Sequence, residues 1–326
     1  MALLEVDDLS VRFDSDEGSV HAVDRLSFSL EAGEVLAMVG ESGCGKSVTA
    51  MSLLRLLPAS ATLSGAVRFG DRDLLTTDDA SLRGVRGREI SFVFQEPMTS
   101  LNPVFTIGRQ IGEVLRHHLK LGRAEAHDRT LELLELVGIP APARRVDEYP
   151  HQLSGGMRQR VMIAIAVACN PKVLIADEPT TALDVTIQAG ILDLMRDIRE
   201  RLGTAILLIT HDLGVVADVA DRVMVMYAGR KVEEATAGEL FAHPQHPYTT
   251  GLLAALPRSG RRSIDEPLQE IPGVVPSLAQ LPDACAFAPR CPRADEECEQ
   301  VPPLEPVRPA HPVACFHPGE AVWNGR

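Results

Sequence analysis

The stretch GESGCGKS, residues 40–47, decides how the rest of the chain is interpreted. It follows an apolar run at 35–39 that predicts a buried strand, and it precedes residues 47–57, which predict a helix. The pattern G-x-x-x-x-G-K-[ST] between a strand and a helix is typical of a phosphate-binding loop, because glycines let backbone N–H groups curl around anionic oxygens. We expect Lys46 to reach the β- and γ-phosphates of a nucleotide and the Ser47 hydroxyl to ligate Mg²⁺.

Composition narrows the class of protein. The chain has 326 residues, 45% of them hydrophobic, and a formal net charge of -13, which argues against broad nucleic-acid binding because that requires a basic face. The acidic start, MALLEVDDLS, does not resemble a signal peptide. No apolar run approaches the roughly 18 residues that span a bilayer. We therefore expect a chain on the cytoplasmic side, with any membrane role exerted through a partner.

The remaining periodicity predicts a mixed α/β protein. Residues 3–13 and 20–30 alternate in polarity and predict strands of an antiparallel sheet, whereas 106–137 predict amphipathic helices inserted between strands. Further strands are predicted at 65–70, 89–94, 173–176, 205–209, 222–227 and 231–233. Phe13 could stack on a nucleobase or could be an ordinary core aromatic.

Polar side chains follow several predicted strands. Gln95 ends ISFVF, Asp177 and Glu178 end VLIA, and His211 follows the strand at 205–209. Ligands bind at the carboxyl ends of strands in α/β sheets, so Asp177 could hold Mg²⁺ through water and Glu178 could orient or deprotonate an attacking water. Gln95 is well placed for a metal or that water, although each residue alone could be structural.

A second helix start has anion-binding character. Ser154 precedes Gly155 and Gly156 in LSGGM, so the serine could cap the following helix, with the two glycines in its first turn. A plain N-cap explains the same pattern. Asp184 lies near the start of another predicted helix.

The last part of the chain is rich in proline and cysteine. Cys285, Cys291, Cys298 and Cys315 lie in a segment without regular periodicity, and a cytosolic chain is not expected to keep two structural disulfides. Four thiolates would suit a metal that stabilises a segment with little core of its own. The spacing lacks the C-x₂₋₄-C of most structural zinc sites, and Pro292 follows Cys291 as in some iron–sulfur motifs.

Residues 1–235 resemble the ATP-binding subunits of ABC transporters. The resemblance rests on the order of these motifs and residues along the chain: GESGCGKS, Gln95, LSGGM, VLIADEP, Asp184 and His211. QEPMTSLNP, YPHQLSGGM, HPYTTGLLAALP and the cysteine-bearing tail further resemble the ATPases of oligopeptide/dipeptide permeases. The resemblance implies a P-loop ABC-type ATPase core with an antiparallel β subdomain and an α-helical subdomain at about 96–157. Residues 236–326 would be the C-terminal module with the four-cysteine cluster.

The resemblance also implies a role for each matching residue. Asp177 would be the Walker B aspartate and Glu178 the catalytic base. His211 would be the switch histidine, and Gln95 would be the γ-phosphate sensor and a Mg²⁺ ligand. The Walker A loop would consist of Gly40, Glu41, Ser42, Gly43, Cys44, Gly45, Lys46 and Ser47. Ser154, Gly155 and Gly156 would bind the ATP held by an opposite subunit, Asp184 would belong to the loop that crosses this interface, and Phe13 would stack on adenine. Met157 departs from the glutamine common in this signature, whereas Ser154 and both glycines match it.

A transporter subunit of this kind would need several partners. The resemblance implies a second, related ATPase subunit in a heterodimer, two membrane-spanning permease subunits, an extracytoplasmic solute-binding protein and no nucleic acid. It favours a [4Fe-4S] cluster on the four cysteines, with zinc or unligated thiols as alternatives. The rival functions are a soluble ATPase of this class acting on DNA or ribosomes, and an importer of nickel or another solute.

Overall fold

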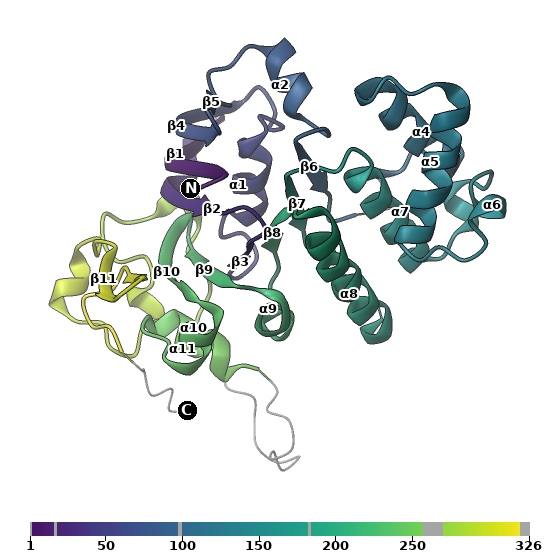
Figure 1. The fold of residues 1–326 in the computed structure, drawn as a ribbon. Helices are drawn as coiled ribbons and strands as arrows, with labels where there is room; N and C mark the ends of the chain where they lie inside the picture. Colours follow the sequence, from purple (N-terminus) through teal and green to yellow (C-terminus); the bar gives the residue numbers. More distant parts are fainter. Residues whose placement is uncertain (1, 16–17, 97–99, 182–183, 257–269, 320–326) are drawn as a thin grey trace. The chain divides into compact units, whose positions relative to one another are not determined.

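The computed structural model describes residues 2–15, 18–96, 100–181, 184–256 and 270–319 (Figure 1). The chain divides into two compact units. Unit 1 comprises residues 1–2, 30–34 and 76–209, and unit 2 comprises residues 3–29, 35–75 and 210–326. Within the described ranges, no helix combines the length and apolar character needed to cross a bilayer.

Unit 1 combines three parallel strands with a group of helices. The strands β6 (Ile90–Val93), β7 (Val173–Asp177) and β8 (Ala205–Ile209) lie side by side, and the whole of β7 and β8 is buried. Strands buried along their whole length are apolar throughout, as the sequence is here. The helices are α2 (Asp79–Val85), α4 (Ile107–His118), α5 (Arg123–Leu136), α6 (Pro142–Arg145), α7 (Gly155–Val167) and α8 (Val185–Leu202), with the short turn η1 (Pro150–Gln152).

The helical segment predicted at 106–137 is two helices. α4 begins after Thr106, whose hydroxyl accepts a hydrogen bond from the backbone N–H of Arg109, and α5 begins after Gly122. Both pack against α7, as Figure 1 shows in teal. Ile107, Ile111 and Leu115 form the buried stripe of α4 at the spacing that an amphipathic helix requires.

Unit 2 contains an antiparallel sheet with the order β2-β1-β4-β5. Its strands are β1 (Leu4–Ser15), β2 (Gly18–Leu30), β4 (Ala61–Phe69) and β5 (Arg72–Asp73). The predicted strands at 3–13 and 20–30 are therefore confirmed, but β4 begins four residues before the predicted position. Residues 16–17, between β1 and β2, lie outside the described residues.

A second set of strands in unit 2 has the order β11-β12-β10-β9-β3. The strands are β3 (Val35–Val39), β9 (Arg222–Tyr227), β10 (Arg230–Thr236), β11 (Glu305–Arg308) and β12 (His311–Val313). The helices are α1 (Lys46–Leu53), α9 (Leu213–Val219), α10 (Ala237–Ala242) and α11 (Pro247–Ala254), followed by the turns η2 (Leu278–Gln280), η3 (Ala288–Arg290) and η4 (Glu296–Glu299). α1 ends four residues before the predicted helix end at 57, because Arg55 adopts a left-handed φ of 50° and Pro58 follows.

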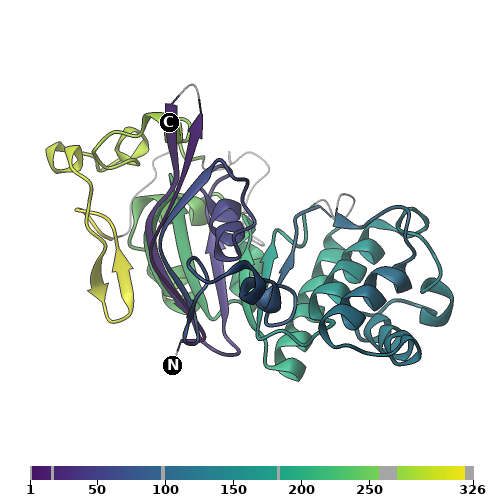
Figure 2. The same cartoon turned by 90° about the horizontal axis from the view of Figure 1, so that it is seen from above.

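The C-terminal segment continues this second sheet. β12 pairs with β10, and β11 forms a hairpin with β12 that is drawn in yellow in Figure 2. One hydrophobic core contains Tyr227 of β9, Tyr248 of α11 and Phe287 of the tail. The tail therefore packs within the same compact unit as the phosphate loop. The boundary predicted at 235/236 remains a prediction.

A buried carboxylate fastens the tail to β10. Glu233 is fully buried and accepts hydrogen bonds from the backbone N–H groups of Gln245, at 2.7 Å, and His246, at 2.9 Å. His311 of β12 contacts the same carboxylate through Nε2 at 2.7 Å. Three segments distant in sequence thus meet at one side chain.

Replacing this carboxylate tests its role. Glu233→Gln should lower the free energy of unfolding by about 1–3 kcal/mol. The NH₂ group of the glutamine would replace one carboxylate oxygen, and a donor now bound to that oxygen would lose its acceptor. Urea unfolding gives the free energy, and hydrogen exchange at 311–313 should accelerate. Glu305→Gln on the exposed face of β11 is the matched control, with an effect within about 0.5 kcal/mol. Equal losses in both variants would contradict this assignment.

Candidate functional site

The phosphate loop is a tightly curled turn between β3 and α1. Gly40 has φ 153° and Gly45 has φ 99°. A Cβ added at Gly40 would lie 2.3 Å from the carbonyl oxygen of Met226, and one at Gly45 would lie 2.4 Å from that of Ala22. Only glycine fits both the conformation and the space at these positions. The predicted strand–turn–helix is therefore present.

The ammonium group of Lys46 lies against carbonyl oxygens of the phosphate loop. The side chain is buried, and Nζ donates to the carbonyl oxygens of Gly40, at 2.8 Å, and Glu41, at 3.0 Å. Burial raises the pKa of the Cys44 thiol, and the charge of Lys46 opposes this shift only in part. Cys44 is therefore a neutral packing residue, whereas the ammonium group of Lys46 is suited to bind phosphate oxygens.

Three predicted residues of unit 1 meet at one edge of its parallel strands. β6 and β7 pair with Val93 opposite Ala176, which brings their carboxyl ends together. Gln95 Nε2 donates to Glu178 Oε2 at 3.0 Å, and Asp177 is the buried last residue of β7. Gln95 therefore lies beside Glu178 at this edge, and the roles expected for the three residues remain predictions.

Glu178 is held in a strained conformation. Its φ is 47°, which is uncommon for a residue with a side chain, while its backbone N–H donates to the carbonyl of Ile209 at 2.8 Å. Thr181 Oγ1 donates to Glu178 Oε2 at 2.8 Å. Two donors on one carboxylate oxygen fix the orientation of the side chain. Thr181 was missed in the sequence, although a hydroxyl three residues after the acidic pair could have drawn attention to it.

The second predicted helix start is confirmed as a capped terminus. Ser154 is the N-cap of α7, and its hydroxyl accepts from the backbone N–H of Met157 at 3.4 Å. Ser154 and Gly155 are exposed, whereas Gly156 is buried and a Cβ there would lie 2.7 Å from a methyl carbon of Ile187. The serine and the first glycine are therefore accessible to a ligand.

The other residues predicted to contact the nucleotide lie on separate elements. Asp184 is exposed at the N-cap of α8, and residues 182–183 before it lie outside the described residues. Phe13 is half-buried in β1 opposite Ala61. His211 is exposed and belongs to unit 2, whereas Glu178 belongs to unit 1. The roles that the resemblance implies for these residues remain predictions.

The four tail cysteines line one small cavity, together with Phe287 and His317. Burial raises the pKa values of Cys285, Cys291 and Cys315, the last to about 11, and the neighbouring thiols add to each shift. Such thiols stay protonated at neutral pH unless a cation replaces the proton. The gathering of four sulfur groups around one cavity fits a thiophilic metal.

Other donors border the cysteines. Possible ligand atoms of Asp295, Cys298 and His317 lie within 4.8 Å of one another, and the Asp295 carboxylate contacts His317 Nε2 at 2.9 Å. The neighbouring His317 side chain is the main cause that lowers the pKa of Asp295. A mixed donor set of this kind is more typical of zinc than of an iron–sulfur cluster. The chemistry of the donors therefore leaves both metals open.

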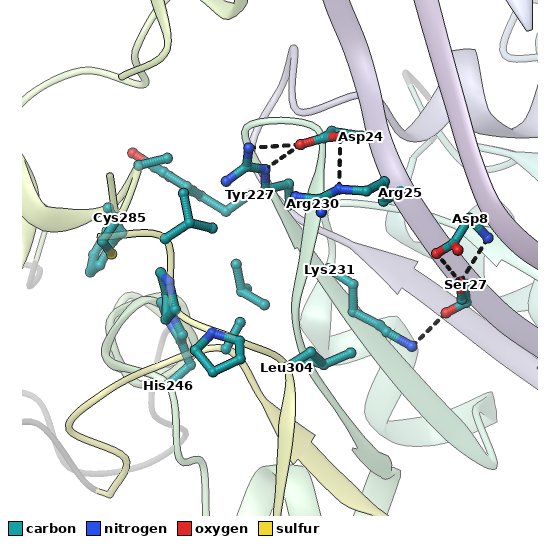
Figure 3. Close-up of a pocket in the computed structure, with 17 residues that line it drawn as sticks. Asp8, Asp24, Arg25, Ser27, Tyr227, Arg230, Lys231, His246, Cys285 and Leu304 are labelled. Atoms are coloured by element: carbon teal, nitrogen blue, oxygen red, sulfur yellow. Dashed lines mark hydrogen bonds and ion pairs between the residues drawn. The ribbon is translucent and has the colours of Figure 1, made fainter. Parts of the chain in front are cut away.

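A larger cavity, of about 520 Å³, is also lined by Cys285 (Figure 3). Its wall includes β2, β10 and the apolar segment 301–304. Arg230 pairs with Asp24 at 2.7 Å, and Lys231 Nζ donates to the Ser27 carbonyl at 2.6 Å, so its basic side chains have protein partners. Of the four tail cysteines, Cys285 lines both cavities.

Two protein families match parts of this chain. Residues 23–181 match the family described as ABC transporter, and residues 232–298 match the family described as Oligopeptide/dipeptide transporter, C-terminal region. Oligopeptide transport ATP-binding protein OppD of Escherichia coli (strain K12) is 50% identical over 321 residues, which cover 98% of this chain and 95% of that protein. Dipeptide transport ATP-binding protein DppD of Bacillus subtilis (strain 168) is 49% identical over 317 residues, covering 96% and 94%.

A solved structure agrees with the fold. The chain superposes on a dimeric ATP-binding cassette in a post-hydrolysis state bound to ADP and Pi with a TM-score of 0.65 and 27% sequence identity. The superposition covers 72% of this chain and 98% of that one. The mixed α/β cassette predicted from the sequence is thus confirmed.

Proposed function

We propose, because this chain belongs to the family of ABC transporter ATP-binding proteins, that it hydrolyses ATP to power a membrane importer of peptides. The observation that carries the ATPase part is the curled phosphate loop with the buried Lys46, together with Gln95 and Thr181 on the Glu178 carboxylate. The importer and its peptide substrate are supported by the relatives, which are named as oligopeptide and dipeptide transport proteins.

Each residue has a definite part in the proposed reaction. Loop N–H groups and Lys46 bind the phosphates, and Glu178 accepts a proton from the attacking water. Gln95 and Thr181 keep the carboxylate directed while it does so. Mg²⁺, held by Ser47, Gln95 and Asp177, would neutralise charge on the phosphates.

The remaining nucleotide contacts complete the proposal. Phe13 would stack on adenine, and His211 would assist hydrolysis at the γ-phosphate. Ser154, Gly155, Gly156 and Asp184 would act at the ATP of a second, related ATPase subunit. The exposure of Ser154 and Gly155 supports a contact with another chain.

Two variants test the ATPase proposal. Glu178→Gln should retain ATP binding while turnover falls at least about 100-fold, because the amide cannot accept a proton. Lys46→Ala should instead weaken ATP binding, because a charge beside the phosphates is lost. Phosphate release and equilibrium ATP binding measure the two effects. Wild-type turnover in Glu178→Gln would refute the role of Glu178 as the base.

The partners would be two permease subunits and an extracytoplasmic solute-binding protein, with this chain at the cytoplasmic side of the membrane. Exposed apolar side chains in unit 1 support a docking site for a permease segment. Val104 is 70% exposed and Phe94 is 42% exposed, and both lie near α4 in sequence. Aromatic side chains such as Phe94 are enriched in protein interfaces.

Charge at this surface should disrupt the complex. Val104→Asp should reduce the permease recovered with the ATPase by at least about fivefold, because an unpaired carboxylate would be buried at the interface. Val274→Asp in unit 2 is the matched control, since Val274 is an equally small side chain that is 84% exposed. Equal recovery of the permease with both variants would argue against this docking site.

We further propose that the four tail cysteines hold a [4Fe-4S] cluster, with zinc as the alternative metal. Their thiols border one cavity and would serve as thiolate ligands. The cluster would have a structural or redox-sensing role. The sequence resemblance to permease ATPases with a cysteine-bearing tail favours iron, whereas Asp295 and His317 beside Cys298 are the observation in favour of zinc.

Anaerobic purification decides between the metals. We expect iron and acid-labile sulfide in equal amounts and a brown protein, and Cys291→Ser should lower both. Cys169→Ser, at a buried cysteine of unit 1, should leave the iron content unchanged. Colourless protein with stoichiometric zinc would show that the cysteines bind zinc and not a cluster. Protein without either metal would show that the thiols are unligated.

A further inference from the structure

The C-terminal segment forms hydrogen bonds with Glu41 of the phosphate loop. The Arg290 guanidinium pairs with the Glu41 carboxylate through two hydrogen bonds, Nη1 to Oε2 at 2.7 Å and Nη2 to Oε1 at 3.0 Å. The hydroxyl of Tyr248 accepts from the backbone N–H of Glu41 at 2.8 Å. Both the side chain and the backbone of this loop residue are thus held by residues more than 200 positions away.

Arg290 is itself rigidly placed. Its side chain is 4% exposed, and Nε donates to the carbonyl of Pro272 at 2.9 Å. The rings of Tyr227, Tyr248 and Phe287 pack with centroids 4.7–5.4 Å apart and enclose this region. A planar guanidinium with two parallel bonds to a carboxylate fixes both distance and orientation, which a lysine could not do.

The contact reaches the phosphate-binding lysine. The Glu41 carbonyl accepts from Lys46 Nζ at 3.0 Å, so a shift of Glu41 would move an acceptor that positions the ammonium group. An unpaired Glu41 carboxylate would also repel a triphosphate in the loop. Arg290 therefore holds Glu41 in place and neutralises a negative charge beside the phosphate loop.

Two tail cysteines bracket the turn that presents Arg290. In η3, the backbone N–H of Ala288 donates to the Cys285 carbonyl at 3.0 Å, and that of Cys291 donates to the Ala288 carbonyl at 3.1 Å. The position of Arg290 thus depends on the backbone at both cysteines. The same turn belongs to the cysteine cavity and to the support of the phosphate loop.

We propose that Arg290 is a positioning residue of the ATP site, so that the C-terminal segment sets the affinity of the phosphate loop for ATP. The inference rests on the proposed function of the loop. Because coupling between two sites is reciprocal, ATP binding must in turn stabilise the turn from Cys285 to Cys291.

Binding measurements in the full chain test the proposal, with Glu178→Gln as the background in every variant so that ATP is not consumed. Arg290→Gln should raise the Kd for ATP about tenfold, the loss expected for a buried charge-assisted pair, and Arg290→Lys should lie between it and wild type. Arg293→Gln is the matched control, because the Arg293 guanidinium donates to the carbonyls of His317 and Gly319 within the tail. Its Kd should stay within about twofold of the background value.

A second change separates positioning from general damage to the fold. Adding Glu41→Gln to Arg290→Gln should recover part of the lost affinity, because it removes the uncompensated carboxylate. ATP should slow hydrogen exchange at 285–291 in the background protein but not in Arg290→Gln. If Arg290→Gln does not fold, Tyr248→Phe provides the test, because it removes only the acceptor for the Glu41 N–H.

The outcomes distinguish this inference from the function on which it rests. Lys46→Ala must abolish ATP binding in the same assay, and retained binding there would refute the proposed nucleotide site. If Lys46→Ala abolishes binding while Arg290→Gln or Tyr248→Phe binds ATP within twofold of the background, the site stands and the role of Arg290 is refuted. Equal losses in Arg290→Gln and Arg293→Gln would also overturn it.

Discussion

The close approach of the phosphate loop to its neighbours is the constraint on which the arrangement of unit 2 depends. At Gly40 and Gly45 the loop passes so near the carbonyls of Met226 and Ala22 that a single methyl group would collide with backbone. Backbone cannot move aside as a flexible side chain can, so β2 and β9 must be in place for the loop to curl. A loop held in this way binds anions with little reorganisation, which is the property that a phosphate site needs.

Electrostatics impose a related demand. Lys46, Glu41 and Arg290 are charged groups in a largely buried region, and an unpaired charge there would be costly. The chain satisfies each of them locally: loop carbonyls accept from Lys46, and Arg290 pairs with Glu41. In unit 1, the Glu178 carboxylate accepts hydrogen bonds from two neutral side chains on one oxygen, and the residue has a left-handed φ of 47°. Strain at such a residue persists only where surrounding contacts enforce it, which is common at catalytic positions.

Much of this could be predicted from the sequence, and the residues show where prediction stops. Apolar runs predicted the buried strands β7 and β8, because this signal is local, whereas the hydrogen bond between Gln95 and Glu178 joins residues 83 positions apart and was not predicted. The end of α1 was predicted too late, since the left-handed conformation of Arg55 has no signature in the periodicity. The hairpin of β11 and β12 was not predicted, because the prolines of the tail hide strand alternation. Proline is tolerated at Pro306 and Pro312 in a short hairpin at the sheet edge.

The pair of Arg290 and Glu41 lay beyond sequence reasoning for a different reason. No periodicity links residues 249 positions apart, and an arginine in a proline-rich tail usually suggests only a solvated surface. The structure also gives a physical meaning to one stretch that otherwise supported only a resemblance. HPYTTGLLAALP contributes Tyr248, whose hydroxyl accepts from the N–H of Glu41, while His246 Nδ1 accepts from the N–H of Tyr248 and caps α11. The bond at His246 holds Tyr248, whose hydroxyl is the acceptor for Glu41, so α11 belongs to the support of the phosphate loop.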